Sequence, residues 1–341
     1  MTGSDAISED ALQVVCVTPI RNEAWILDKF LACTNLWADQ VVVLDQRSDD
    51  GSREIACRHP KVILEDYAPD EFDEPQRRGR LFEIARRLPI PRLLLALDAD
   101  EFLSADFAES AEWEQVRRAP AGTVIRIERL GILPGAAQCW SEGYMACGLV
   151  DDGTPFETAP IHGPRIPHSP AAPVLDLKDI KMLHYQFMDW QRMRSKHRWY
   201  ECWELLHSPQ KRPITLYRQY HRMEAVPKEH LRPVAAPWLD GYLSRGIDMK
   251  TVAQEPSYRW DKEVLALFAV HGTQKFRRLD VWDADWSAMS RQFGCPAAPG
   301  SLRDPRSAFE KAVHRWLKKT QAQSSKPRIR WMQRALIPFG W

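Results

Sequence analysis

Two carboxylates one residue apart, Asp98 and Asp100, stand directly behind an apolar run at residues 93–97. A short apolar run without alternation is typical of a strand buried on both faces, as in a parallel sheet covered by helices. Open α/β folds bind ligands where such strands end. Carboxylates there suit Mg²⁺ or Mn²⁺, which bind oxygen ligands and leave positions for a substrate diphosphate. The alternative is a strand followed by an acidic helix cap, and this segment alone leaves both interpretations open.

The elements upstream favour the metal interpretation. Residues 14–18, 41–44 and 62–64 are apolar runs with high β-propensity, and the segments 25–33 and 53–58 predict helices between them. Strands and helices alternating at this spacing predict right-handed crossovers and a parallel sheet. The polar residues that follow these strands then meet at one edge of the sheet. We therefore expect them to form one ligand site.

Three motifs in this order carry a resemblance. They are Thr-Pro-Ile-Arg-Asn-Glu at 18–23, Val-Val-Leu-Asp at 42–45 followed by Ser-Asp-Asp-Gly-Ser at 48–52, and Leu-Asp-Ala-Asp-Glu at 97–101. Together they are similar to the three signatures of the family 2 glycosyltransferases, over about residues 12–104. The resemblance implies an α/β fold of the GT-A type, with a Rossmann-like, mostly parallel sheet flanked by helices. It extends to His-Tyr-Gln at 184–186, which resembles a later metal-binding histidine of the family.

The resemblance also implies the chemistry, which is transfer of a sugar from a nucleoside-diphosphate sugar to a hydroxyl acceptor, with inversion and with Mn²⁺ or Mg²⁺ as cofactor. Asp100 would be the principal metal ligand. Asp45 would hydrogen-bond the base, although Gln46 and Arg47 stand where many members have Asp-Gly or Asn-Gly. For Asp45 and Asp49 the alternative is turn chemistry and N-capping. The implied nucleotide-sugar-binding residues are Pro19, Arg21, Glu23, Asp45, Arg80 and Asp98, and the implied metal ligands are Asp100, Asp98 and His184.

The departing diphosphate needs positive charge beside the metal. Arg77 and Arg80 lie in a basic segment just before a predicted helix at 81–87, which leads to the metal strand. Arginine suits phosphate because its planar guanidinium offers a fork of donors. We expect Arg80 to take this role, with Arg77 as the second candidate. The alternative for both is a solvated basic helix face.

A single inverting displacement needs a carboxylate that takes the proton of the acceptor hydroxyl. Residues 131–175 are rich in Pro and Gly, and a loop region of this length is often functional. Asp151 and Asp152 lie there, between the two metal motifs, and we expect one of them to be the catalytic base. Glu157 is a third candidate, and Glu142 remains possible. The sequence Asp-Asp-Gly is also an ordinary turn, which is the alternative.

Length and composition are compatible with this function. The chain has 341 residues and a net charge of +1, so nothing indicates general binding of nucleic acid, which needs concentrated positive charge. The first ten residues are polar and acidic, unlike a secretion signal, and no apolar run approaches the ~18 residues of a membrane span. The seven cysteines are odd in number and lack a Cys-x-x-Cys spacing. We therefore expect a cytoplasmic protein without a transmembrane segment.

Three parts are expected along the chain. They are a polar N-terminal segment (1–11), a GT-A catalytic domain (12–207, with a nucleotide-sugar half at about 12–104 and an acceptor half at about 105–207) and a mainly helical C-terminal region (208–341). The tail 326–341 combines basic side chains with Trp331, Phe339 and Trp341. Such a tail suits weak peripheral contact with the inner membrane surface. The alternative is docking of its apolar side on the rest of the protein.

Two other classes of function stay open. One is a catalytically silent nucleotide-sugar-binding or scaffolding protein on the same fold, although the intact Asp98, Asp100 and His184 argue against it. The other is a nucleotidyltransferase, which would need a Gly-rich basic segment after the first strand, where this chain has Pro19 to Glu23. Stabilisation by a nucleoside diphosphate with Mn²⁺ would separate a competent site from a silent one. These motifs specify neither the base and sugar of the donor nor the acceptor.

Overall fold

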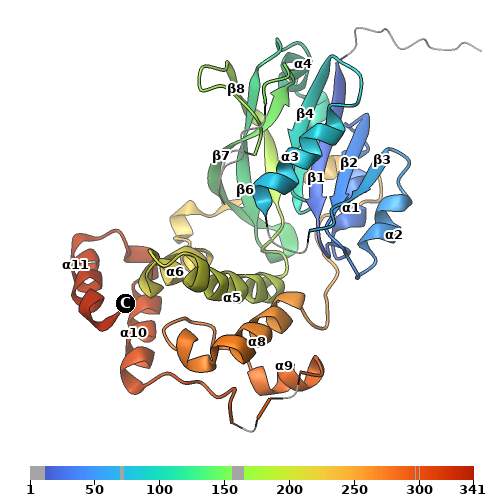
Figure 1. The fold of residues 1–341 in the computed structure, drawn as a ribbon. Coiled ribbons are helices and arrows are strands. Elements are labelled where there is room, and N and C mark those ends of the chain that lie inside the picture. The colour runs from blue at the N-terminus through green and yellow to red at the C-terminus, as the bar shows by residue number, and fades with distance from the viewer. Residues whose placement is uncertain (1–11, 70–72, 156–164, 296, 299) are drawn as a thin grey trace, which may run out of the picture. The chain divides into compact units, whose positions relative to one another are not determined.

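The chain divides into two units in the computed structural model, which describes residues 12–341 except 70–72, 156–164, 296 and 299 (Figure 1). The sheet unit comprises the chain up to Met188 together with Arg232–Gln254. The helical unit comprises Asp189–Leu231 and Glu255–Trp341. These bounds differ from the expected division at residue 207. The helix that begins at Trp190 belongs to the helical unit, and 232–254 returns to the sheet unit, where β9 (Arg232–Pro233) adds a strand next to β7 (Gln138–Val150).

The sheet unit is built on a nine-stranded sheet. Its strands run in the order β3-β2-β1-β4-β7-β6-β8-β5, and β3, β2, β1 and β4 are parallel. The remaining pairings are antiparallel except that of β6 with β8. The predicted α/β class is confirmed, with parallel pairing concentrated in the first half. The other strands are β1 (Gln13–Ile20), β2 (Gln40–Asp45), β3 (Val62–Asp66), β4 (Arg92–Ala96), β5 (Glu101–Leu103), β6 (Val124–Ile132) and β8 (Val174–His184).

Helices cover both faces of the parallel strands. Figure 1 shows α3 (Glu74–Ala85) lying along one face, and it contacts β1 and β2. Alternate residues of β1 face opposite sides, so that Val14 and Cys16 join the core that contains α1 (Leu27–Thr34), whereas Val15 and Val17 join the core that contains α3. Burial on both faces, at about 1.5–3 kcal/mol for each large apolar side chain, explains why these strands are apolar without alternation. The remaining helices of this unit are α2 (Ser52–Cys57), α4 (Ala111–Arg117), α7 (Pro237–Leu243) and the 3₁₀ helices η1 (Ala105–Glu109) and η2 (Pro134–Ala136).

Residues 131–175, expected to be a loop region, instead contain the end of β6, the whole of β7 and the start of β8. Gly148 of β7 shows why a glycine in this region does not indicate a loop. A Cβ at this position would lie 2.7 Å from Leu95 Cδ2 and 2.9 Å from Ile125 Cβ. Glycine is therefore needed here for close strand packing, which the sequence does not distinguish from a turn.

The helical unit contains six α-helices among its described residues. Its core gathers around Leu216, Val264, Phe268 and Trp286, all less than 7% exposed. No helix among the described residues is long and apolar enough to cross a membrane. The helices are α5 (Trp190–His207), α6 (Pro213–Tyr220), α8 (Arg259–His271), α9 (Trp286–Gln292), α10 (Ala308–Lys319) and α11 (Pro327–Leu336), with 3₁₀ helices η3 (Arg222–Ala225), η4 (Lys228–His230), η5 (Thr273–Phe276), η6 (Gln321–Gln323) and η7 (Ile337–Phe339).

A buried ionic network surrounds His221 in the helical unit. The imidazole is 1% exposed and stacks on Tyr217, with ring centroids 4.0 Å apart. Its Nδ1 lies 3.1 Å from Glu224 Oε1, and its Nε2 lies 3.2 Å from Glu201 Oε1. Burial alone would lower the pKa of His221, but the two carboxylates reverse this effect and raise the pKa to about 9. The folded protein therefore holds this ring in the protonated form at neutral pH.

Raising the pH from 6.5 to 9 is expected to destabilise the protein through His221. The pKa of this ring is about 9 in the folded state against an ordinary value of 6.5. Its stabilisation is therefore complete below pH 6.5 and is lost as the pH rises through 9, which amounts to about 3 kcal/mol. Urea denaturation across this range measures the effect. His221→Gln is the control, because an amide does not titrate. Parallel pH profiles for the two proteins would contradict the prediction.

Candidate functional site

The segments that follow β1 and β2 are joined at the carboxyl edge of the parallel strands. Ile20 pairs with Asp45 at the ends of these strands, so Pro19, Arg21 and Glu23 lie at the same edge as Asp45, as expected. Backbone N–H groups of the first segment donate to side chains of the second, since Asn22 bonds Ser48 Oγ and Glu23 bonds Ser52 Oγ, both at 2.8 Å. The second motif therefore supports the first through short polar side chains.

Two aspartates of the second motif have structural contacts. Asp49 Oδ1 accepts a hydrogen bond from Asn22 Nδ2 at 2.8 Å, and Asp50 Oδ2 accepts one from the Ala24 N–H at 2.9 Å. Asn22 has φ 58°, a left-handed conformation that asparagine tolerates better than most residues. These contacts agree with the turn interpretation for Asp49 and explain why the motif is rich in Ser and Asp.

Asp45 is fully buried at the end of β2. Its Oδ2 accepts a hydrogen bond from Arg53 Nη1 at 2.8 Å and one from the Ser48 N–H at 3.2 Å. Arg53, near the start of α2, also pairs with Asp66 at the end of β3. Asp45 thus organises the turn that follows its strand, and its proposed contact with a nucleobase stays a prediction.

The structure favours Arg77 over Arg80 at this edge. α3 begins at Glu74 rather than at residue 81, because Asp73 caps it by accepting from the Gln76 N–H and Pro75 stands in its first turn. Arg77 lies in that first turn, and its Nη1 is 3.3 Å from Gln46 Oε1, directly behind Asp45. Arg80 lies one turn further along and pairs with Glu83 on the exposed side of the helix. Arg77 rather than Arg80 thus contacts the segment that follows β2, and the contact of either arginine with phosphate stays a prediction.

The third motif forms the turn between β4 and β5. Asp98 is partly exposed, whereas the Asp100 side chain is 13% exposed and Glu101 is fully buried. Glu101 Oε2 accepts a hydrogen bond from the Asp98 N–H at 3.0 Å, which closes the turn. Burial would raise the pKa of Glu101, but Arg165, His184 and Arg129 together bring the pKa below its ordinary value. The turn therefore presents three carboxylates, of which Glu101 points inward.

The pairing of β5 with β8 brings His184 to this turn. Glu101 is opposite His184 in the antiparallel register, and the Tyr185 N–H donates to the Asp100 carbonyl at 2.8 Å. His184 Nε2 lies 3.8 Å from Asp100 Oδ2. On the other side of the ring, Nδ1 lies 2.7 Å from Glu142 Oε2, a carboxylate on β7. Glu142 thus orients the imidazole so that its second nitrogen faces Asp100.

Two arginines link the carboxylates of the site into one network. Arg165 binds Glu101 with both Nη atoms, and its Nη2 also lies 2.8 Å from Asp98 Oδ2. Arg129 lies 3.2 Å from Glu101 Oε1 through Nη1 and 2.9 Å from Glu142 Oε2 through Nε. Neither arginine belongs to a sequence motif. Arg129 reaches the site through the strand pairing of β6, and Arg165 reaches it from the chain that precedes β8. Glu101 stands within the third motif and could have been chosen from it.

The charges of the site are compatible with a divalent cation. Four carboxylates (Asp98, Asp100, Glu101 and Glu142) face two guanidinium groups, so two negative charges are in excess when His184 is neutral. Among the described residues, no three His, Cys, Asp or Glu side chains form a group that could hold a metal. Asp100 and His184 offer two ligands, which is sufficient for an ion that completes its shell with water and substrate phosphates. Asp98, paired with Arg165, is less available than expected.

The placement of Asp151 and Asp152 corrects the prediction for the catalytic base. Val150 pairs with Leu93 at the start of β4, so both aspartates lie at the opposite edge of the sheet from Asp98 and Asp100. Asp151 is buried between Arg86 and Arg92, at 2.8 and 2.7 Å. Burial would raise the pKa of Asp151, but the two arginines lower it overall. Its contacts are those of a buried ion pair. Glu157 lies outside the described residues.

Comparisons with known proteins assign no family. No family model and no curated protein matches this chain. Among solved structures, a 4-diphosphocytidyl-2C-methyl-D-erythritol synthase is similar over 34% of this chain and 59% of that chain, with 16% identity and a TM-score of 0.27. A glucosyl-3-phosphoglycerate synthase from Mycobacterium tuberculosis in complex with phosphoglyceric acid is similar over 35% and 44%, with 15% identity and a TM-score of 0.26. The chain thus matches about half the length of these proteins, and likenesses at these TM-scores do not assign a function.

Proposed function

We propose that this protein is a metal-dependent, inverting glycosyltransferase that uses a nucleoside-diphosphate sugar. The observation that carries the proposal is the meeting of Asp100 and His184 at the carboxyl edge of β4, with His184 held by Glu142. The ring N–H of a metal-binding histidine that faces away from the metal commonly donates a hydrogen bond to a carboxylate, which fixes the orientation of the ring. The strand-end segments beside this pair carry the first two motifs of the resemblance. The nucleotide-sugar donor and the metal would thus bind at the same edge of the sheet.

Each group at this edge has a role in the proposal. Asp100 and His184 would hold Mg²⁺ or Mn²⁺, which neutralises charge on the departing diphosphate when bound. Glu142 and Asp100 outweigh the effect of burial and raise the pKa of His184, so binding of the cation would release a proton from the ring. Arg77 replaces Arg80 as the candidate for phosphate contact. Glu157, which lies outside the described residues, stays a candidate for the catalytic base from the sequence alone.

A nucleotide panel tests this function. Purified protein is melted with UDP, GDP, CDP or ADP, each with Mn²⁺, Mg²⁺ or EDTA. We expect one diphosphate to stabilise the protein in a metal-dependent way, by about 2.7 kcal/mol at a hundredfold excess over its Kd. Mass spectrometry then identifies the product from the matching nucleotide sugar. Release of the nucleoside diphosphate supports glycosyl transfer. Release of pyrophosphate from a nucleoside triphosphate and a sugar phosphate would instead identify a nucleotidyltransferase, and no thermal shift would indicate a silent scaffold.

Replacing Glu142 with glutamine is expected to weaken metal binding about tenfold to a hundredfold. The amide still fits beside His184 but no longer offers a charged acceptor for the ring N–H. Titration of Mn²⁺ in the presence of the diphosphate measures the change. Glu128→Gln is a matched control, because Glu128 lies on the adjacent strand β6 and pairs with Lys181 and Arg232 instead. Equal Mn²⁺ affinities for the wild type and Glu142→Gln would contradict the role of Glu142.

A further inference from the structure

The C-terminal helix α11 is docked on the helical unit by one side. Ile329 is 6% exposed, and Trp341, beyond the helix, is 1% exposed. Trp341 and Leu336 pack in an apolar cluster with Ile214 of α6 and Leu317 of α10. The buried side of α11 therefore agrees with docking of the tail on the rest of the protein. Docking does not account for the residues on the other side of the helix.

The other side of α11, and the turn η7 that follows it, expose large apolar side chains to solvent. Trp331 is 67% exposed and Phe339 is 61% exposed. Phe339 lies 5.8 Å from the ring of Phe309, which is itself 48% exposed. Single exposed apolar residues need no explanation, but several neighbouring ones mark an interaction surface. Trp and Phe are typical of the apolar face of segments that lie on a membrane surface.

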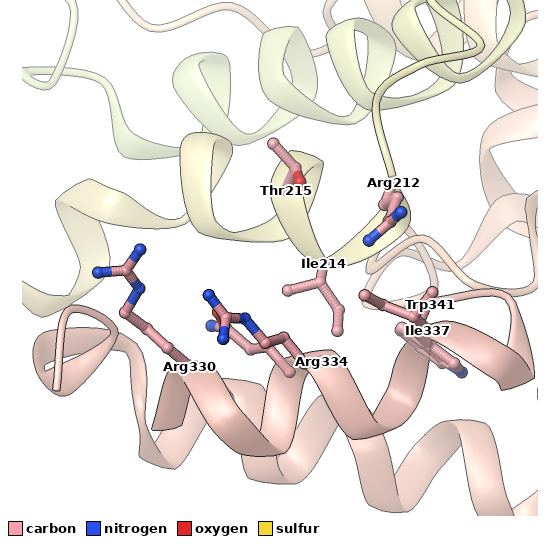
Figure 2. A pocket seen from close by; sticks show the side chains of 8 residues that line it. Arg212, Ile214, Thr215, Arg330, Arg334, Ile337 and Trp341 are labelled. Carbon is pink, nitrogen blue, oxygen red and sulfur yellow. The ribbon is translucent and has the colours of Figure 1, made fainter. Parts of the chain in front are cut away.

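A basic pocket lies between the start of α6 and α11 (Figure 2), and its lining residues Arg330 and Ile337 stand one and two positions before Trp331 and Phe339 in the chain. Its volume is about 170 Å³. This is small compared with ligand pockets of about 300–1,000 Å³, so it suits one charged group rather than a whole nucleotide. Arg212 directly precedes α6, and Arg330 and Arg334 lie on α11. The other lining residues are Ile214, Thr215, Gln333, Ile337 and Trp341.

The three guanidinium groups of this pocket lack acidic partners. Within the described part of the chain, no carboxylate lies within 4.0 Å of Arg212, Arg330 or Arg334. Some other arginines of the helical unit do pair with acids, as Arg198 does with Asp261 at 2.7 Å. The tail 326–341 contains four basic residues and no acidic residue. α6 also begins here without a side-chain cap, so its first N–H groups add partial positive charge.

We propose that this face of the helical unit binds an anionic phospholipid surface, with a headgroup phosphate in the pocket of Arg212, Arg330 and Arg334. Guanidinium groups bind phosphate through charge-assisted, often paired hydrogen bonds. Trp331 and Arg334 are three residues apart on the helix and are therefore surface neighbours. A bilayer surface can bind the arginine and the exposed ring at the same time, because its phosphate groups lie next to the boundary of the acyl chains. A soluble phosphate would use the arginines and leave the exposed rings in water. The proposal does not depend on the catalytic function.

Liposome co-sedimentation of the full chain tests the proposal. Vesicles of phosphatidylcholine alone are compared with vesicles that contain phosphatidic acid or phosphatidylglycerol, at low and at high salt. We expect binding only to the anionic vesicles, and weaker binding at high salt because exposed charges are screened. Arg330→Gln/Arg334→Gln is expected to bind about thirtyfold less tightly, since each basic residue that contacts such a surface contributes about fivefold.

Matched variants separate the pocket from general charge. Lys326→Gln/Arg328→Gln removes the same number of charges at the start of the same helix, at exposed positions outside the pocket. We expect this control to lose less than fivefold, and Trp331→Ala to lose about tenfold with an unchanged melting temperature. Equal losses for the two double variants would overturn the pocket as the headgroup site. Binding of glycerol phosphate without vesicle binding would overturn the membrane surface, as would equal binding to neutral vesicles.

Discussion

Asp100→Ala is expected to abolish sugar transfer, by at least a thousandfold, and to remove the metal dependence of nucleotide binding. Asp100 is the carboxylate that faces His184 Nε2 at 3.8 Å, and its removal leaves one protein ligand for a divalent cation. Loss of that charge also leaves the departing diphosphate unneutralised. Isothermal titration with the diphosphate and Mn²⁺, followed by turnover measurements, reports both effects.

Asp152→Ala is the matched control for this experiment. Asp152 follows β7 at the opposite edge of the sheet and accepts a hydrogen bond from the Thr154 N–H at 2.9 Å. We expect its removal to leave turnover within about twofold, since surface substitutions away from special features change little. Unchanged affinity and turnover in Asp100→Ala would remove the proposed metal site. Loss of turnover in Asp152→Ala would instead restore this residue as a candidate base.

Replacing Arg165 with methionine is expected to destabilise the protein by about 3 kcal/mol and to reduce transfer strongly. Arg165 binds the fully buried Glu101 with two donors and also holds Asp98. Removal of one member of a buried ion pair leaves an uncompensated charge, which typically costs about 3–5 kcal/mol. Because Arg129 remains near Glu101 and still offsets part of its charge, we expect a loss of stability at the lower end of this range. Urea denaturation measures the loss.

Two further variants make the role of Arg165 specific. Arg165→Lys keeps the charge but loses the paired donors, so we expect a smaller loss of stability. Arg165→Met/Glu101→Gln removes both partners and is expected to recover part of the stability, because no buried charge is left unpaired. The double variant should still be impaired in transfer, since Asp98 has lost its partner. A double variant no more stable than Arg165→Met would show that packing, rather than charge, accounts for the loss.

The sequence by itself determined the parallel half of the sheet. The runs at 14–18, 41–44 and 93–97 are apolar because β1, β2 and β4 are buried on both faces, and the run at 62–64 forms β3, a partly buried edge strand. The sequence also placed the ends of β1 and β2 at one edge, because consecutive βαβ units have one favoured hand. It also indicated a mainly helical C-terminal region, but it did not indicate where the chain leaves and re-enters the sheet unit.

Only the tertiary structure decided which further charged side chains surround Asp100 and His184. The resemblance implies that pair, and the antiparallel pairing of β5 with β8 brings the two residues together, whereas Glu142 reaches His184 from β7. Strand pairing between distant segments depends on packing in the whole sheet, which short motifs do not encode. The same long-range pairing carried Asp151 to the far edge of the sheet, where Arg86 and Arg92 bury it. Local sequence therefore fixed which strands end in carboxylates, and long-range register fixed which of those carboxylates can act together.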